Sequence, residues 1–377
     1  MAGYKDREKE AAELHIAHIF SHGGVVGVTT SGLELVRALL RNGHRVTLVH
    51  RPGAWISKQE FPNGIELVPL DMGVRVLHYC SIRKLYRLLK DRGVEVVHTH
   101  GSVADRIGGL MYTFGTIPTL AKAAARILHM HWRFHDIVVA PSQYTANWYI
   151  KNGLVSAKKM RVIPNCLEKG EFQLADKTAN DGLKSELGLP KEAFVLGSVG
   201  GIDKRKNQSA IVPIIHRLIE IGINAHIVLV GRKGQKETTK IQSLATQLGI
   251  ADHVHLIGHR ADARELMRGF DALISTTRDD QVPVALTEGL ATGLPIYFSN
   301  VGIASEVITN GFNGYVFELA GLESDAGLID DICDLARSPM RTEKVCVHNR
   351  SLFERRFTPD KVVPMFEELY REMAQSS

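Results

Sequence analysis

The sequence has few cysteines, no long apolar run and no low-complexity tract. Its four cysteines form no CxxC pair, which argues against a zinc site or a disulfide framework and favours a reducing compartment. No uncharged apolar run reaches the ~18–20 residues that a membrane span needs, and residues 1–13 lack the apolar core of a signal peptide. We therefore expect a cytoplasmic protein, either free or bound peripherally at the inner face of the cytoplasmic membrane.

The length and charge of the chain indicate two domains of different character. A chain of 377 residues is longer than one core usually holds. Residues 1–170 contain 23 Lys and Arg against 13 Asp and Glu, a net charge of +10, so the remainder carries −5. A basic first half favours an anionic partner, although an uneven surface charge without any function fits the same numbers. Nucleic acid is not expected, because no recognised binding motif accompanies the charge.

Short apolar runs rich in β-branched residues alternate with helical patterns along the chain. Strands are expected at residues 15–20, 45–50, 65–68, 94–98, 137–140 and 160–163, then at 194–199, 225–230, 253–257, 272–275, 296–299 and 314–317. Helices are expected at 31–42, 81–92 and 143–152, and an amphipathic helix at 359–373. This alternation predicts βαβ units in two successive doubly wound parallel sheets that face one another across a cleft. The polar segment 168–192 is interpreted as a linker with a short helix inside.

Two carboxylates eight residues apart are the most informative feature. Asp280 lies in a loop after the apolar run 271–276, and Glu288 lies about one turn into a helix that ends at Gly293. This arrangement places both acids at the carboxyl end of a strand, where open α/β sheets bind ligands. Two acids at such a place can accept hydrogen bonds from several hydroxyls of a sugar nucleotide. The alternative is a turn former and a solvated helix residue.

Glycine-bearing loops follow three of the expected strands. One combines a glycine pair with three cations ahead of a helix, which suits a diphosphate: Gly200, Gly201, Lys204, Arg205 and Lys206. The others follow the next strand and the first strand of the chain, with Gly231 and Arg232, and with Gly23 and Gly24. Plain solvated turns fit the same residues. The GxGxxG pattern is missing, so a dinucleotide is not expected.

Histidines and basic helices carry weaker signals. His98 and His100 end a strand, and we expect one to point into the sheet face and the other toward the crevice. His131 and His135 have the i, i+4 spacing of a helical metal pair, but no third ligand is evident, so no metal site is expected. Two segments are basic: the stretch 122–135, and the helix with Arg83, Lys84, Arg87 and Lys90. They are interpreted either as a contact for anionic lipid headgroups or as solvated helix faces.

Taken in order, these motifs resemble the retaining glycosyltransferases of family 4, which have the GT-B fold. The similarity covers nearly the whole chain and consists of Gly23-Gly24, Gly43 to Val46, Val96 to His100, Ser142, Ile163-Pro164-Asn165, Gly200 to Lys206, Gly231, Leu256-Ile257-Gly258, Asp280 with Glu288, Gly293-Leu294-Pro295, and Gly311 to Phe317. No single element is decisive, but the ordered set is highly specific.

The resemblance implies roles for particular residues. Asp280 and Glu288 occupy the two acidic positions of the family's Glu-x7-Glu motif, so that Glu288 would hold ribose hydroxyls and Asp280 would contact the donor sugar. Lys206 matches the phosphate-binding lysine, and His100 is a catalytic candidate beside Lys206 and Asp280. The remaining donor-binding candidates are the glycine-loop residues above together with Gly258, Gln281, Val282, Pro283 and Val284.

The chain departs from the family pattern at four places, one of which is Cys166 in place of the usual glycine after Asn165. Asp280 is one methylene shorter than the usual glutamate. Gly201 replaces the arginine that partners the lysine, and Lys204 or Arg205 is the expected substitute. The segment after Pro118 offers no histidine where the family has a strand ending in one.

The resemblance also implies a domain plan and an activity. The plan is an acceptor-binding domain over 1–170, a linker over 171–192, a nucleotide-sugar domain over 193–357, and a helix over 358–377 that returns to the first domain. The activity is retaining transfer of a hexose-like sugar from a UDP- or GDP-sugar, without metal or cofactor, to a saccharide or lipid-linked acceptor in cell-surface polysaccharide or lipopolysaccharide synthesis. A non-catalytic nucleotide-sugar-binding protein of this fold stays open. An oxidoreductase and a solute-binding protein are disfavoured by the missing dinucleotide fingerprint and export signal.

Overall fold

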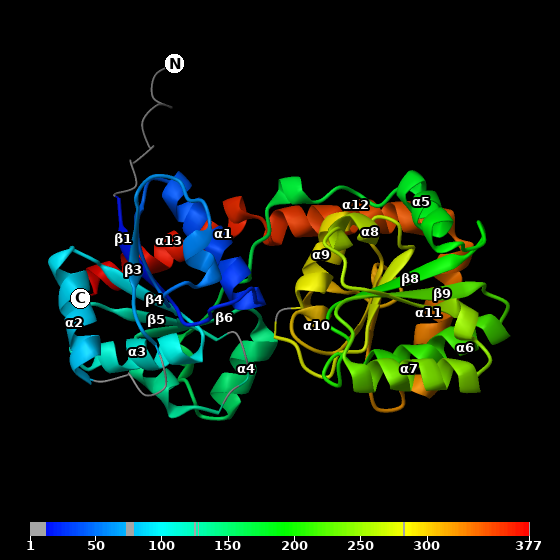
Figure 1. The fold of residues 1–377 in the computed structure, drawn as a ribbon, viewed down its shortest axis with the longest axis horizontal. Coiled ribbons are helices and arrows are strands. Elements are labelled where there is room, and N and C mark those ends of the chain that lie inside the picture. Colours follow the sequence, from blue (N-terminus) through cyan, green and yellow to red (C-terminus); the bar gives the residue numbers. More distant parts are fainter. Residues whose placement is uncertain (1–12, 73–78, 124–125, 127, 282, 377) are drawn as a thin grey trace, which may run out of the picture. The chain divides into compact units, whose positions relative to one another are not determined.

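The computed structural model describes residues 13–72, 79–123, 126, 128–281 and 283–376, which form two compact units (Figure 1). The first contains the described residues up to Pro141, residues 145–166 and those from Pro359 onward, and the second contains residues 142–144 and 167–358. Each has a parallel sheet with helices on both faces, so the predicted α/β class with two Rossmann-like domains is confirmed. Among the described residues, no helix is both long and apolar enough to cross a bilayer.

Seven described strands form the first sheet, in the order β3-β2-β1-β4-β5-β6-β7. They are β1 His15–Phe20, β2 Arg45–His50, β3 Ile65–Pro69, β4 Val96–His100, β5 Thr119–Lys122, β6 Ile137–Ala140 and β7 Met160–Val162. All pair in parallel, and the central strands β1 and β4 end together, with Phe20 opposite His100. After β1 the chain adds strands on one side of the sheet, and after β4 it adds strands on the other side. The boundary between β1 and β4 is therefore the topological switch point of the sheet.

Helices cover both faces of the first sheet (Figure 1). One face carries α1 Gly27–Arg41 and α13 Pro359–Gln375, and the other carries α2 Tyr79–Asp91, α3 Ser102–Tyr112 and α4 Gln143–Lys151. The short 3₁₀ segments are η1 Trp55–Lys58, η2 Met130–Phe134 and η3 Ala157–Lys159. Helix α13 buries Val362, Phe366, Leu369 and Met373, whose three- and four-residue spacing puts them on one helical face. The predicted return of the C-terminal helix to the first domain is therefore confirmed.

Six described strands form the second sheet, in the order β10-β9-β8-β11-β12-β13. They are β8 Phe194–Val199, β9 Ala225–Val230, β10 Val254–Gly258, β11 Ala272–Ser275, β12 Ile296–Ser299 and β13 Gly314–Phe317, all parallel. The switch point here lies between β8 and β11. Because both faces are covered, the strands are continuous apolar runs rather than alternating patterns.

Two layers of helices enclose the second sheet (Figure 1). One core contains side chains of α6 Val212–Glu220, α7 Gln235–Gln247 and α11 Ala326–Arg337. The opposite core contains those of α5 Lys177–Leu187, α8 Ala263–Met267, α9 Val284–Thr292, α10 Ala304–Val307 and α12 Pro339–Arg356. The short 3₁₀ segments are η4 Lys169–Glu171, η5 Gln208–Ile211, η6 Ala251–His253 and η7 Leu322–Ser324.

Three features differ from the sequence-based expectation. Strand β5 was not expected, because it has only four residues and ends in Lys122, a lysine that is fully buried here. Helix α1 begins at Gly27 rather than Ser31, and its first turn is closed by the Thr29 hydroxyl, which accepts the Val26 N–H at 3.0 Å. The short helix expected inside the linker is present as α5, but its Leu183 belongs to the core of the second unit.

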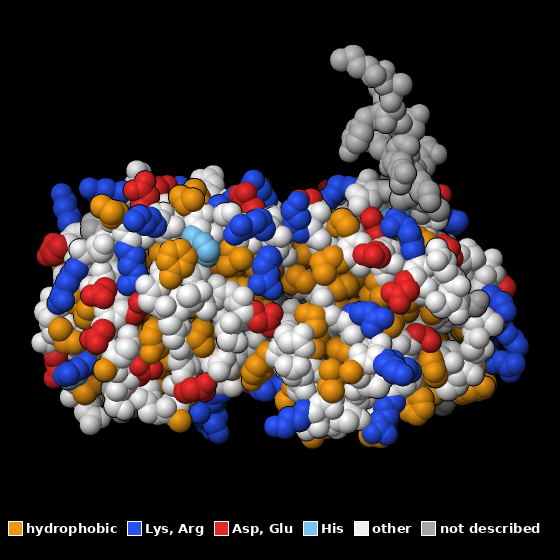
Figure 2. All heavy atoms as spheres, turned by 180° about the vertical axis from the view of Figure 1, so that it is seen from behind, with side chains coloured by type: hydrophobic (Ala, Val, Ile, Leu, Met, Phe, Trp, Pro, Cys, Tyr) orange, Lys and Arg blue, Asp and Glu red, His pale blue; other side chains and the backbone are white. Residues whose placement is uncertain are grey.

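The charge imbalance between the halves is not gathered into a single basic patch on the face in Figure 2. Basic, acidic and apolar side chains are interspersed there over both units. The excess of cations in residues 1–170 is therefore not by itself evidence for a binding surface on this face.

Candidate functional site

The carboxyl ends of β8 and β11 carry the residues that the sequence singled out most strongly. Strand β8 leads into the loop 200–207, and β11 leads into the loop 276–283 that precedes α9. Because these adjacent strands flank the switch point of the second sheet, their loops form the edge at which open α/β sheets bind ligands.

An ion pair joins the two loops across this switch point. The Lys206 ammonium lies 2.6 Å from Asp280 Oδ2, and Arg205 Nη1 lies 3.6 Å from the same oxygen. The side chains of Lys206 and Asp280 are 14% and 15% exposed, so the pair is shielded but open to an incoming ligand. Arg205, rather than Lys204, is the second cation beside Asp280, and which of the two substitutes for the family arginine stays a prediction. Lys204 is exposed.

Asn207 holds the basic loop in place, and the sequence did not point to it. Its backbone φ is 57°, the one positive value among described residues other than glycine. Its Nδ2 donates to the Thr276 carbonyl, while the Thr276 hydroxyl donates to the Asn207 carbonyl at 2.8 Å. Arg278 donates to Asn207 Oδ1 at 2.7 Å. The only sequence signal is the residue type, because asparagine tolerates the left-handed conformation better than most residues.

Glycines let the loops after β8 and β9 approach each other. At Gly231 the backbone φ is 158°, and an added Cβ would lie 1.9 Å from the Gly200 carbonyl oxygen. Gly231 N–H donates to the Gly258 carbonyl at 2.8 Å, and Ile202 N–H donates to the Arg232 carbonyl at 3.0 Å. Gly200, with φ 146°, lies against the Lys206 side chain, where a Cβ would meet Cε at 3.4 Å. Packing therefore requires glycine at position 231 and the positive φ favours it at position 200, while their role in donor binding stays a prediction.

Glu288 is buried on α9 and is paired with a residue that the sequence did not indicate. Its side chain is 11% exposed, and Oε1 accepts a hydrogen bond from Arg264 Nε at 3.0 Å. Burial raises the pKa of the Glu288 carboxyl, and the Arg264 guanidinium opposes that shift. Arg264 lies on α8, 24 residues before Glu288, so no local spacing predicts the contact.

The remaining donor-binding candidates of the second unit differ in burial and contacts. Gln281 is buried, and its amide donates to Asp279 Oδ1 at 2.6 Å. Pro283 is the N-cap of α9 and Val284 its first residue, so both lie at the helix N-terminus. Val282 lies outside the described residues. Gly201 is exposed, and a Cβ there would meet only Asp203 Oδ2, at 3.7 Å.

The first unit places Gly23, Gly24 and His100 at its own switch point. The glycines follow β1 and His100 ends β4, and Ser21 N–H donates to the His100 carbonyl. An added Cβ at Gly23 or Gly24 would meet no described atom within 4 Å, and neither φ is among the positive values. Packing among the described residues therefore gives no reason for glycine there. Their expected role beside a donor stays a prediction.

The expected orientation of the two β4 histidines is wrong. His98 and His100 point to the same face, because residues two apart in a strand share a face. Their rings stack at 4.2 Å, and His18 Nδ1 lies 2.9 Å from His100 Nε2. Both are fully buried, and burial lowers their pKa values well below the ordinary range. The catalytic role of His100 stays a prediction that this burial does not favour.

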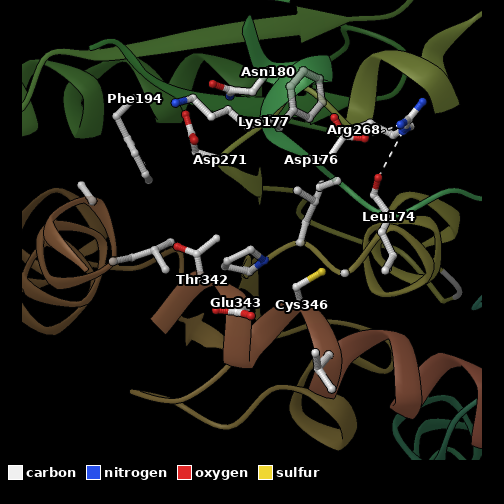
Figure 3. A pocket seen from close by; sticks show the side chains of 18 residues that line it. Leu174, Asp176, Lys177, Asn180, Phe194, Arg268, Asp271, Thr342, Glu343 and Cys346 are labelled. Atoms are coloured by element: carbon white, nitrogen blue, oxygen red, sulfur yellow. Dashed lines mark hydrogen bonds and ion pairs between the residues drawn. The ribbon is translucent and has the colours of Figure 1, made fainter. Parts of the chain in front are cut away.

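A cavity of about 760 Å³ lies at the opposite edge of the second sheet (Figure 3). It is lined at the amino-terminal ends of β8, β11 and β12 by Phe194, Asp271 and Pro295, and by Cys346 of α12. It contains no residue of the predicted site. Parallel sheets bind their ligands at the carboxyl edge, so this cavity does not compete with the β8–β11 edge as the candidate site.

Two family-specific sequence profiles match the chain. "Glycosyltransferase Family 4" matches residues 25–169, and "Glycosyl transferases group 1" matches residues 180–344. The first match lies in the first unit apart from residues 142–144 and 167–169, and the second match lies in the second unit. Together they account for most of the chain.

Several curated proteins are similar in sequence. UDP-Gal:alpha-D-GlcNAc-diphosphoundecaprenol alpha-1,3-galactosyltransferase of Escherichia coli is 25% identical over 264 residues, covering 65% of this chain and 67% of that protein. D-inositol 3-phosphate glycosyltransferase of Xylanimonas cellulosilytica is 22% identical over 345 residues, covering 78% and 80%.

Solved structures share the fold over nearly the full length. Anabaena Alr3699/HepE in complex with UDP aligns with a TM-score of 0.81 and 16% identity, covering 95% of this chain and all of that one. A glycosyltransferase from Rickettsia africae aligns with a TM-score of 0.81 and 17% identity, covering 97% of this chain and all of that one. These similarities establish a GT-B fold. With both profiles matched in order, the chain belongs to the group 1, family 4 glycosyltransferases.

Proposed function

We propose that this glycosyltransferase moves a hexose-like sugar, with retention, from a nucleotide diphosphate sugar to a hydroxyl of a saccharide or glycolipid acceptor. The observation that carries the proposal is the Lys206–Asp280 pair at the β8–β11 switch point, with Arg205 beside it and Glu288 on the following helix. The names of the relatives support the donor class, because one is a UDP-Gal-dependent galactosyltransferase and a structural neighbour was solved with UDP.

In this proposal the second unit binds the donor at its phosphates, ribose and sugar. Lys206 and Arg205 lie beside the diphosphate and neutralise the charge that develops as the anomeric C–O bond breaks, which lowers the barrier without a required metal. Asp280 is released from Lys206 by the competing phosphate and accepts hydroxyls of the sugar. Glu288 accepts the ribose hydroxyls. The acceptor hydroxyl forms the new bond from the face that the diphosphate leaves, and its proton departs with the diphosphate.

The acceptor and pathway are the less constrained part of the proposal. We favour an acceptor in cell-surface polysaccharide or lipopolysaccharide synthesis. Relatives with such names support it, including a lipopolysaccharide core biosynthesis glycosyltransferase of Rhizobium meliloti that is 23% identical over 185 residues. That similarity covers 49% of this chain, so it supports the class of acceptor and not a particular one.

A second candidate is a protein of the same fold that binds a nucleotide sugar without transferring it. Two observations favour it. Gly201 stands where the family has an arginine, and β5 ends in the buried Lys122 where the family has a histidine. Release of nucleotide diphosphate by the purified protein separates the candidates, since only the transferase produces it.

A thermal-shift screen against UDP-, GDP- and ADP-sugars tests the donor class. A ligand at a concentration 100 times its Kd stabilises the fold by about 2.7 kcal/mol, which is readily detected. We expect one nucleotide series to raise the Tm, and the corresponding free sugars to have little effect. No shift with any series would contradict both candidates.

We also propose that the first unit contacts an anionic lipid surface. Leu128, Met130 and Phe134 are 68%, 55% and 48% exposed, an unusual density of apolar side chains within seven residues. Arg133 is exposed within this stretch. The Lys159 ammonium lies 5.0 Å from the centre of the Tyr112 ring, and Tyr112 belongs to α3. Exposed apolar side chains beside cations suit an interface with anionic headgroups.

Vesicle flotation tests the lipid contact. We expect the protein to float with vesicles containing phosphatidylglycerol and to bind phosphatidylcholine vesicles weakly. Replacing Leu128, Met130 and Phe134 together by serine should reduce flotation several-fold. Val347→Ser is the matched control, because it removes a 66% exposed apolar side chain from the second unit. Equal flotation of the triple variant and the control would contradict the proposed contact.

A further inference from the structure

We propose that Arg264 is a positioning residue for donor binding, which keeps the Glu288 carboxylate ionised and oriented toward the ribose. The inference rests on the proposed function, because it assumes that Glu288 accepts the ribose hydroxyls. It adds a residue whose action passes through Glu288 and not through direct contact with the donor.

The geometry fixes Arg264 from several sides. Its Nε donates to Glu288 Oε1 at 3.0 Å, and Nη1 pairs with Glu171 of η4. Its guanidinium lies 4.9 Å from the centre of the Phe172 ring. A guanidinium held by two carboxylates and an aromatic face cannot turn freely, so the Glu288 carboxylate that it binds is also held in one orientation.

The contact leaves half of the carboxylate available. Arg264 occupies Oε1, whereas Oε2 accepts no hydrogen bond within the described part of the chain. An ionised carboxylate has up to four acceptor positions and no donor, which suits the two O–H donors of a ribose diol. A protonated carboxyl would present a donor of its own to the same diol.

The electrostatics explain why an arginine is needed here. Burial raises the Glu288 pKa, and Arg264 is the group that opposes this rise, while Glu171 adds to it. Removing the Arg264 charge leaves the desolvation of Glu288 uncompensated, so its pKa increases further. The ionised fraction at a given pH then falls, which weakens the charge-assisted acceptor for the donor.

The contact differs from an ordinary surface ion pair, which contributes little. The Glu288 side chain is 11% exposed, although Arg264 itself is 46% exposed. A mostly buried carboxylate depends strongly on its partner, while a half-exposed arginine can be replaced without disrupting a core.

The test measures the preference for ribose and not activity alone. Affinities for UDP and GDP, and for their 2′,3′-dideoxy forms, are measured by titration calorimetry on the whole protein. The variants are Arg264→Gln, Arg264→Lys, Glu288→Ala, and Arg260→Gln as the matched control. Arg260 also bridges two carboxylates, Asp262 and Glu186, in the same unit, but does not contact Glu288.

We expect the wild type and the control to bind the diphosphate about tenfold or more tightly than its dideoxy form, as loss of a charge-assisted hydrogen bond predicts. Arg264→Gln should reduce that preference to within about twofold by weakening only the ribose form, and Arg264→Lys should restore part of it. As the pH is lowered, any preference that remains in Arg264→Gln should disappear at a higher pH than in the wild type, because Glu288 of the variant becomes protonated at a higher pH.

Four results separate the inference from the proposed function. A preference that survives in Arg264→Gln, or a loss of affinity that is equal for both ligand forms, overturns the positioning role. A preference that survives in Glu288→Ala shows instead that Glu288 does not bind the ribose, and the proposed role of that residue fails. A wild type that binds the ribose and dideoxy forms equally would also show that Glu288 does not bind the ribose.

Discussion

The Lys206→Met substitution is the sharpest perturbation of the proposed chemistry. It removes the ammonium that lies 2.6 Å from Asp280 Oδ2 while keeping a side chain of similar length against Gly200. Loss of one preorganised group that stabilises developing negative charge costs about 2.7–4 kcal/mol in the transition state. We therefore expect kcat for donor hydrolysis to fall about 10²- to 10³-fold.

The same substitution has a smaller effect on folding. Removing one partner of a fully buried ion pair costs about 3–5 kcal/mol, and removing a surface partner costs less than about 1 kcal/mol. The pair here is 14% and 15% exposed, and Arg205 stays 3.6 Å from the carboxylate. An intermediate loss of about 1–3 kcal/mol in the free energy of unfolding follows, which leaves the protein folded.

The assay is nucleotide release at saturating and limiting donor, together with the Tm of each variant. Lys191→Met is the matched control, because Lys191 is an exposed lysine that precedes β8 at the other edge of the sheet. Its kcat should stay within about threefold of wild type, since a surface substitution away from the site changes little. If Lys206→Met stays folded and its kcat falls no more than that of the control, the assignment of Lys206 to the diphosphate is refuted.

Three further predictions concern other described residues. Asn207→Gly should keep several-fold more donor affinity than Asn207→Ala by calorimetry, because both variants lose the side-chain hydrogen bonds but only glycine adopts φ 57° without strain; equal affinities would contradict this. Burial raises the pKa of Asp105 to about 8, so the folded state binds a proton that the unfolded state releases above pH 3.8, and stability falls as pH rises between those values. Asp105→Asn should therefore raise the Tm near pH 8 and leave it nearly unchanged near pH 4, and a gain independent of pH would contradict the raised pKa. His100→Phe should keep more than about a tenth of kcat, because the ring stacks on Phe20 at 4.2 Å in the core; a loss like that of Lys206→Met would instead support catalysis by His100.

The sequence predicted the parts of the site that depend on local pattern. The end of α9 at Gly293 was readable because glycine adopts the left-handed conformation there, with φ 81°, and a proline follows two residues later. Asp280 and Lys206 were identified by their positions after apolar runs. Their mutual contact depends on the neighbouring places of β8 and β11 in the sheet, which the spacing along the chain did not predict.

The parts that the sequence missed depend on long-range packing. Strand β5 is short and ends in a buried lysine, which breaks the apolar pattern of a strand. In the sequence, Arg264 does not differ from an ordinary basic residue of a short helix. Its contact with Glu288 arises only from the fold. The orientation of His98 and His100 was predictable from the two-residue period of a strand, and the expectation misapplied that period.

The most direct test of the central claim follows the sugar itself. Purified protein is incubated with α-linked UDP- and GDP-hexoses and a membrane-derived saccharide acceptor, and the anomeric proton of the product is recorded by NMR. We predict that nucleotide diphosphate is released together with an α-linked product, and that Lys206→Met forms both about 10²- to 10³-fold more slowly. A β-linked product would contradict retention, and the absence of nucleotide release from every donor would contradict sugar transfer altogether.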